Sequence, residues 1–167
     1  MPAPIVIAYH LIWTAYGWWL PNDIRGSTSR FVESELIFEL GDLHYGRKQV
    51  QPARSELLAF FGRAAGRLKH DMLEFGAAEV AAIANALRAA IDLHRYTCYA
   101  CAIMPDHVHV LIRKHKHLAE DMIANFQEAT RVELRRLGLR DPDHPVWGGP
   151  GWKVFLDHPD DVRRTIP

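Results

Sequence analysis

The sequence predicts an α+β domain of ferredoxin-like type, in which an antiparallel sheet packs against helices. The first observation is the order of the patterned segments, which is strand, helix, strand, strand, helix, strand. The second is a connection of three residues between two of the strands, which is long enough only for an antiparallel hairpin. The third is size, because 167 residues with 49% hydrophobic content suffice for one compact domain with a core.

The N-terminal third begins with a strand and continues with loops. Residues 5–16 are β-branched and aromatic without a helical period, which predicts a first, central strand. Residues 17–29 are rich in Gly, Pro, Asn, Asp and Ser and predict a loop. Residues 30–54 are poorly patterned, and we expect an irregular segment with a short helix. Residues 55–70 predict a helix with Ser55 as its N-cap.

The remaining segments complete the pattern of the sheet and its helices. A helix is predicted at 77–93 from apolar residues three and four apart, and another at 118–137. Strands are predicted at 96–103 and 107–113, joined by the Pro-Asp turn. A last strand, 151–156, follows a Pro/Gly loop.

A final helix begins near Pro159, where a proline and acidic residues suit a helix N-terminus. The sequence stops at Pro167 before this helix completes two turns. We therefore expect residues 1–167 to form a single domain that is truncated within its C-terminal helix.

Two histidines at the start of the strand 107–113 are the most informative feature of the chain. His107 and His109 flank Val108, and because side chains alternate along a strand, both must project from the same face. Their Cα atoms are roughly 6.6 Å apart at ~3.3 Å per residue, which lets two imidazoles converge on one cation. A lone strand histidine is more often a packing or surface residue. The pair, delivered by the turn at Pro105, favours a metal site over that interpretation.

Composition limits the classes of protein that fit. The chain has 20 basic and 20 acidic residues, so its net charge of zero argues against non-specific coating of nucleic acid, and any nucleic-acid site must be a local patch. We find no apolar run long enough to span a membrane and no signal-peptide pattern, so we expect no membrane partner. Cys98 and Cys101 lie in a predicted strand, where alternation would place them on opposite faces. Buried, reduced thiols are expected, which weakly favours a cytoplasmic location.

Three segments, in this order, resemble the HUH-type single-tyrosine transposases, in particular the REP-associated kind. Residues 100–112 (ACAIMPDHVHVLI) contain the His-hydrophobic-His motif that gives the class its name. Residues 14–26 (TAYGWWLPNDIRG) are similar to an N-terminal segment of such proteins. Residues 147–164 carry the family-like GWKVFLD and the beginning of DVRRTI, whereas residues 30–75 match poorly.

The resemblance implies a reaction on single-stranded DNA with hairpin ends. A tyrosine hydroxyl attacks a phosphodiester and leaves a 5′-phosphotyrosine and a free 3′-hydroxyl, a linkage that a second strand can reverse. A divalent cation, Mg²⁺ or Mn²⁺, neutralises charge on the phosphate, and its ligands here would be His107 and His109. Relatives take a third ligand from the helix that carries the tyrosine, and some form homodimers.

The resemblance places the nucleophilic tyrosine just after Pro167, in the helix that begins near Pro159. None of the five tyrosines stands at that position; they are Tyr9, Tyr16, Tyr45, Tyr96 and Tyr99. We therefore expect the chain to carry half of the metal site without the nucleophile and to be inactive in cleavage.

DNA contacts are expected at local basic clusters. Residues 113–117 leave the strand of the histidine pair and bring Arg113, Lys114 and Lys116 near the expected phosphate. Arg131 and Arg135 share one face of the helix 118–137, although interleaved glutamates fit an ordinary solvated face equally well. Arg25, with Trp18 and Trp19, could clamp unpaired bases or cover the core.

Three alternatives remain. A non-catalytic DNA-hairpin-binding protein of the same fold would keep recognition without cleavage. A histidine-triad nucleotide hydrolase would need a third histidine where Leu111 stands. A zinc hydrolase would need a further ligand near the pair, and we expect Asp106 to point to the opposite face from His107.

Overall fold

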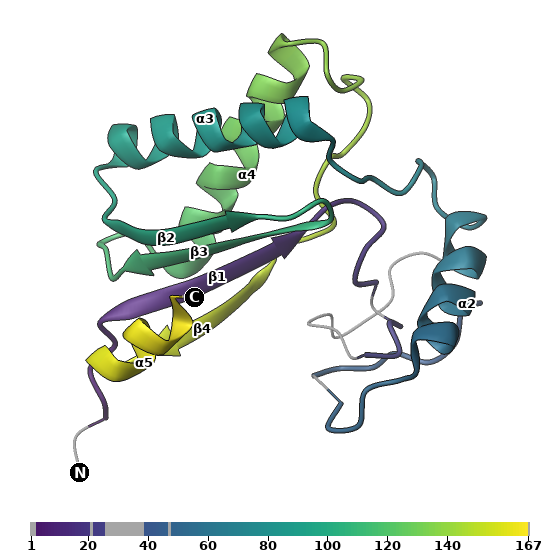
Figure 1. Ribbon diagram of the computed structural model, residues 1–167, viewed down its shortest axis with the longest axis horizontal. Helices are drawn as coiled ribbons and strands as arrows, with labels where there is room; N and C mark the ends of the chain where they lie inside the picture. Colours follow the sequence, from purple (N-terminus) through teal and green to yellow (C-terminus); the bar gives the residue numbers. More distant parts are fainter. Residues whose placement is uncertain (1–2, 21, 26–38, 47, 167) are drawn as a thin grey trace.

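A four-stranded antiparallel sheet is the centre of the computed structural model, which describes residues 3–20, 22–25, 39–46 and 48–166 (Figure 1). The strands are β1 (Ala8–Thr14), β2 (Cys98–Ile103), β3 (His107–Arg113) and β4 (Trp152–Leu156). Their order across the sheet is β2-β3-β1-β4, so β1 and β3 are the central strands.

Two helices cover one face of this sheet. The helix α3 (Ala77–His94) connects β1 to β2, and α4 (Ala119–Arg136) connects β3 to β4, so each helix links two parallel strands that are not neighbours (Figure 1). Both helices lie on the same side of the sheet and bury their apolar stripes against it. The predicted α+β class, the order of elements and the central position of the histidine strand are all confirmed.

The register of β1 against β3 decides which side chains face these helices. Along β1, Tyr9, Leu11 and Trp13 are buried in the main core, and the residues between them face the other way. Along β3, the alternate residues Val108 and Val110 join the same core with Ile112. His107 and His109 therefore project from the face opposite α3 and α4.

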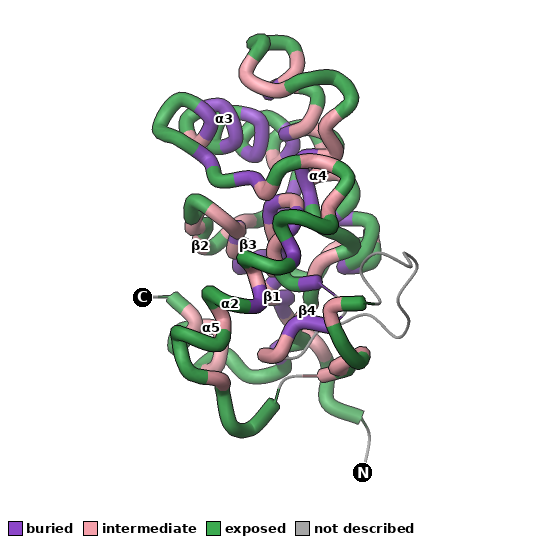
Figure 2. The backbone as a smooth tube through the Cα atoms, turned by 90° about the vertical axis from the view of Figure 1, so that its right-hand side faces the viewer, coloured by how far each residue is buried: buried purple, intermediate pink, exposed green. Residues whose placement is uncertain are grey.

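That second face is covered at one end only, among the described residues. The short helix α5 (Pro159–Thr165) places Val162 against a small cluster of Ala8, Leu111 and Leu156. No residue of α5 is itself buried, and Figure 2 shows the contrast with the buried stretches of β1 and α3. The histidines lie at the other end of this face. His107 is the first residue of β3, and Leu111, which belongs to the covered cluster, comes two residues after His109.

The segment between β1 and α3 forms a separate layer beside the sheet. Its helix α2 (Arg54–Ala65) stands apart from α3 and α4 (Figure 1) and packs through Phe60 and Ala64 against Leu20. The helix predicted at 55–70 is too long, and Ser55 is not its N-cap, because α2 begins at Arg54 with Ala53 at the N-cap position. It ends at Ala65 because the following residues turn back, with Gly66 as the C-cap.

Other predictions differ in smaller ways. The short helix expected within 30–54 falls partly on residues outside the described part, and the described residues 39–46 and 48–53 are not helical. The first strand covers Ala8–Thr14 and not the whole of 5–16. No helix in the described part of the chain is long and apolar enough to cross a membrane.

The two cysteines do not lie on opposite faces of β2. Cys98 pairs with Ile112 and Cys101 pairs with Val110, two β3 residues that face the same side. The register shifts between Cys98 and Ala100, and this irregularity inserts one residue and reverses the expected parity. Both are free thiols, but the expectation that they are buried is wrong, because Cys98 is half-buried and Cys101 is exposed. Partial desolvation of its sulfur nevertheless raises the pKa of Cys101 to about 11.

Candidate metal and DNA-binding site

His107 and His109 form the core of the candidate site, on the sheet face left open at the start of β3. Their ring centroids are 4.7 Å apart and the rings stand nearly perpendicular, at 81°. Both side chains are half-buried, because they rise from a central strand with a neighbour on each side. The alternation inferred from the sequence thus places the pair on one face, as predicted.

Asp106 holds the first of these rings in place. Its carboxylate Oδ1 lies 2.6 Å from Nδ1 of His107, so it accepts a hydrogen bond from that nitrogen. The expectation that Asp106 points away from His107 is therefore wrong. Asp106 belongs to the turn that precedes β3, and its carbonyl accepts a hydrogen bond from Ala15, so strand alternation does not apply to it. A carboxylate on Nδ1 leaves Nε2 of His107 as the atom available to a ligand.

His10 is a member of the cluster that the sequence did not reveal. It lies on β1, directly opposite Leu111 of β3, and its Nε2 is 2.9 Å from Nδ1 of His109. The two rings are stacked, with centroids 5.1 Å apart and planes at 29°. His10 and Thr14 alternate with the large apolar residues Leu11 and Trp13 along β1, and this pattern could have marked His10 as belonging to the open face.

The environment of His109 and His10 disfavours their charged forms. Burial lowers the pKa of His109 to about 4, and the nearby His107 and His10 rings also disfavour its protonation. Burial likewise lowers the pKa of His10. Neutral imidazole is the form that binds a metal ion, so the shift favours binding at physiological pH.

The candidate site presents two imidazole side chains to an ion and no third protein ligand among the described residues. Nδ1 of each ring has a hydrogen-bond partner within the protein, so Nε2 is the nitrogen of His107 and of His109 that these two contacts leave unused. The described residues contain no group of three or more His, Cys, Asp or Glu side chains placed to hold one ion. Two imidazoles with open positions suit a cation that also binds phosphate oxygens, which is the role expected of Mn²⁺ or Mg²⁺.

Apolar side chains flank the histidines across the sheet. Ile12 stands opposite His109, and Trp152 of β4 stands opposite Ile12, so these residues form one row on the open face. Trp152 is 41% exposed although it lies within a strand. Gly151 precedes it with φ +81°, and a Cβ at that position would lie 2.7 Å from the carbonyl oxygen of Ile12. The close approach of β4 to β1 at this point therefore depends on glycine.

The basic residues after β3 lie farther from the histidines than the sequence suggested. Arg113 is opposite Ala8, so it shares the open face, but it is four residues beyond His109, or about 13 Å along the strand. Lys114 and Lys116 follow and are exposed. The loop is fixed by His117, whose Nδ1 is 2.8 Å from the hydroxyl of Tyr96.

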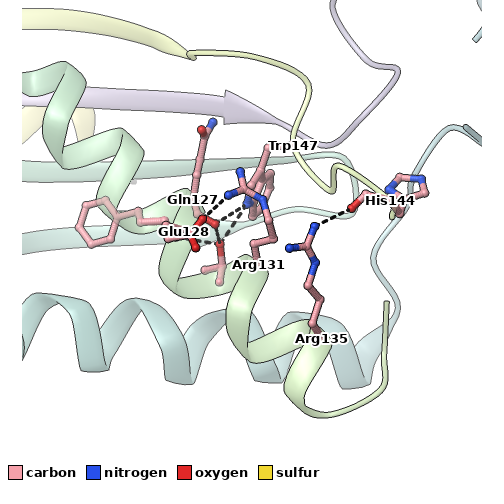
Figure 3. A network of polar contacts seen from close by, with 8 residues as sticks. Gln127, Glu128, Arg131, Arg135, His144 and Trp147 are labelled. Carbon is pink, nitrogen blue, oxygen red and sulfur yellow. Dashed lines mark hydrogen bonds and ion pairs between the residues drawn. The ribbon is translucent and has the colours of Figure 1, made fainter. Parts of the chain in front are cut away.

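Arg131 and Arg135 lie on α4, on the other side of the sheet from the histidine pair. Arg131 forms an ion pair with Glu128 one turn away. Arg135 donates from Nη2 to the carbonyl of His144 at 3.3 Å, in the network drawn in Figure 3. Arg135 therefore links α4 to the loop before β4, whereas Arg131 pairs within α4, and the structure brings neither to the candidate metal site.

Arg25 is engaged within the layer around α2. Its guanidinium forms two hydrogen bonds to the buried carboxylate of Asp23, at 3.0 and 2.7 Å. The same group lies 4.0 Å from the ring centroid of Trp19 and 5.0 Å from that of Phe61. These contacts hold the loop together, and none of them is made with His10, His107 or His109.

Three of the five tyrosines lie away from the histidine pair, while Tyr99 on β2 and Tyr45 in the loop before α2 are exposed. Tyr9 and Tyr96 are buried in the core beneath α3 and α4. Tyr16 contacts the rings of His70 and His144. The expected nucleophile position, after Pro167, is outside the described residues.

Comparison with models of protein families gives no match, and comparison with curated proteins gives none. Among solved structures, the chain is similar to a REP-associated tyrosine transposase bound to a REP hairpin, at TM-score 0.48 and 10% identity, over 99% of this chain and 66% of the other. It is also similar to a protein from Deinococcus radiodurans R1 provisionally classed as a transposase, at TM-score 0.42 and 15% identity, over 99% of this chain and 89% of that one. The chain thus spans about two thirds of the length of the first of these structures.

Proposed function

We propose that this chain is the DNA-processing domain of an HUH-type transposase that acts on single-stranded DNA with hairpin ends. In this proposal His107 and His109 hold a divalent cation, Mg²⁺ or Mn²⁺, against the phosphate to be cleaved. One observation carries it: both histidines project from an open sheet face, and Asp106 and His10 engage their Nδ1 atoms, so that Nε2 is the nitrogen of each ring that these hydrogen bonds do not use. The choice of single-stranded DNA with hairpin ends as the substrate rests on the three sequence segments that resemble the transposase class.

The chemistry of the site follows from these atoms. A bound cation would act as a Lewis acid on the phosphate and so compensate the charge that develops during attack. His107 and His109 would hold it from a central strand of the sheet, while Asp106 and His10 hold their rings through hydrogen bonds. The attacking tyrosine hydroxyl would lose its proton as its oxygen forms a bond to phosphorus, the bond from phosphorus to the 3′-oxygen would break, and the released 3′-oxygen would take up a proton.

The open face also offers contacts for the DNA strand on either side of that phosphate. Trp152 presents an exposed ring two strands away from His109, where an unpaired base could stack on it. Arg113 lies in the other direction, toward the end of β3, at a distance suited to a phosphate further along the strand.

Binding of a hairpin is the direct test of this proposal. The fluorescence anisotropy of a labelled single-stranded hairpin is measured with Mn²⁺ and compared with a duplex and an unstructured strand of the same length. Tighter binding of the hairpin supports the proposal. Equal affinities for all three DNAs, or none, would contradict it.

The alternative is a DNA-hairpin-binding protein of the same fold that does not cleave. It is favoured by the positions of Tyr9, Tyr16 and Tyr96, none of which lies on the histidine face. An SDS-resistant protein–DNA adduct in Mn²⁺ would reject this alternative and would also contradict our expectation that the nucleophile follows Pro167. Hairpin binding without any adduct would support it.

A further inference from the structure

β1 contributes a histidine to a site that the sequence motif assigns to β3 alone. His10 and His109 are 99 positions apart in the sequence, and the pairing of β1 with β3 brings Nε2 of His10 within 2.9 Å of Nδ1 of His109. The stacked arrangement of the rings leaves His109 little freedom to rotate. This contact involves the second ligand of the pair, whereas Asp106 serves the first.

The hydrogen bond between the two rings can be formed in two ways. When Nδ1–H of His109 donates to Nε2 of His10, Nε2 of His109 keeps its lone pair and can bind a cation. When Nε2–H of His10 donates to Nδ1 of His109, neutral His109 carries its proton on Nε2 and cannot bind one. The tautomer of His10 therefore determines whether His109 is a ligand.

We propose that His10 is the positioning residue of the metal site: it accepts the hydrogen bond from Nδ1–H of His109 and so presents Nε2 of His109 to the cation. This inference rests on the proposed function, because it assumes that the site binds a metal ion. His10 acts through His109 and does not itself touch the cation, since its Nε2 is already used in the hydrogen bond.

The assignment of His10 as a partner, and not as a third ligand, follows from two observations. The atom of His10 nearest to the pair faces Nδ1 of His109, the nitrogen on the side away from the proposed cation. The described residues also hold no group of three such side chains arranged around one point. The two ligands thus receive different supports, since His107 has a carboxylate on Nδ1 and His109 has a neutral imidazole.

The test compares His10→Gln with His10→Phe. The amide oxygen of glutamine can accept the hydrogen bond from Nδ1–H of His109, whereas phenylalanine keeps the ring shape and removes the acceptor. Ile12→Val, on the same face of β1, is the matched control because it changes no polar group. Circular dichroism and thermal unfolding establish that each variant is folded.

Two readouts are used on the whole chain. Long-range ¹H–¹⁵N NMR reports the tautomer of His109 without metal, and calorimetric titration with Mn²⁺ reports affinity. We expect Nδ1–H on His109 in the wild type and in His10→Gln, and loss of that preference in His10→Phe. The affinity for Mn²⁺ should fall about 10- to 100-fold in His10→Phe, the range for loss of a ligand's hydrogen-bond partner. It should fall much less in His10→Gln and not at all in Ile12→Val.

Several results would overturn the inference. These are an Nε2–H tautomer of His109 in the wild type, unchanged Mn²⁺ affinity in His10→Phe, or a loss in His10→Gln as large as in His109→Ala, which would make His10 a ligand. If the wild type binds no Mn²⁺ while His109 still shows the Nδ1–H tautomer set by His10, the proposed metal site fails and the positioning contact stands. The two failures are therefore distinguishable.

Discussion

Each imidazole of the candidate site uses one nitrogen within the protein and leaves the other free. His107 is held by a carboxylate from the preceding turn, and His109 by a ring from the neighbouring strand. Partial burial disfavours the charged forms of His109 and His10 and lowers the pKa of both, so these two rings are neutral at neutral pH.

This arrangement predicts a pH dependence of stability that belongs to His109. Its pKa is about 4 in the folded protein and near 6.5 in the unfolded chain. Between these two pH values the unfolded chain binds a proton at His109 and the folded protein does not, so lowering the pH favours unfolding. The free energy of unfolding should therefore be fully retained above pH 6.5 and fall as the pH decreases toward 4. Urea unfolding at pH 7 and pH 5, with a chelator present, should show a smaller decrease for His109→Gln than for the wild type. Equal decreases would contradict the assignment.

Gly151 controls how closely β4 approaches β1. Its φ of +81° and the 2.7 Å between a Cβ and the Ile12 carbonyl oxygen predict that Gly151→Ala lowers the free energy of unfolding by about 1–3 kcal/mol. Gly62→Ala is the control, because Gly62 lies within α2 with nothing within 4 Å of a Cβ. That substitution should stabilise the protein by up to about 1 kcal/mol. Chemical denaturation of the two variants compares them directly, and equal effects would be inconsistent with the close approach.

At the scale of elements, β4 carries exposed aromatic residues on both of its faces. Trp152 shares the face of the histidines, while Phe155, 55% exposed, contacts Tyr9 on the other face. If a base stacks on Trp152, Trp152→Ala should weaken hairpin binding by about 1–3 kcal/mol. Trp152→Phe should retain most of the affinity, and Phe155→Ala all of it. Anisotropy titrations decide this, and an unchanged affinity in Trp152→Ala would remove the stacking contact.

The loop after β3 is the element best placed to meet further phosphates. Lys114 and Lys116 are exposed, whereas Arg131 on α4 is paired with Glu128. We expect Lys114→Gln and Lys116→Gln each to reduce the slope of log affinity against log salt by about 0.7, the value for one contact to single-stranded DNA. Arg131→Gln should change the slope less. The reverse order of effects would place the DNA on the helix side of the sheet.

For the whole molecule, alternation and segment order were enough to predict the sheet, its two covering helices and the common face of His107 and His109. The contribution of His10 was not predictable in this way, because it depends on the register between strands 99 residues apart. The direction of the Asp106 side chain was predicted wrongly because Asp106 lies in a turn, where strand alternation does not apply. The face of Cys98 was predicted wrongly because the irregularity beside it shifts the alternation by one residue. Arg131 and Arg135 lie on the far side of the sheet because α4 packs on the face opposite the histidines. Local patterns predict which residues share a face, and only the assembled sheet determines which residues meet across it.

The central claim is that the histidine face binds a divalent cation and a DNA phosphate together. The most direct test is the affinity for the labelled hairpin with and without Mn²⁺, for the wild type and for His107→Ala combined with His109→Ala. If cation and DNA bind as a unit, Mn²⁺ should strengthen wild-type binding by about 1–3 kcal/mol. The double variant should retain the metal-free affinity and lose the effect of Mn²⁺. An equal effect of Mn²⁺ on both proteins would contradict the account.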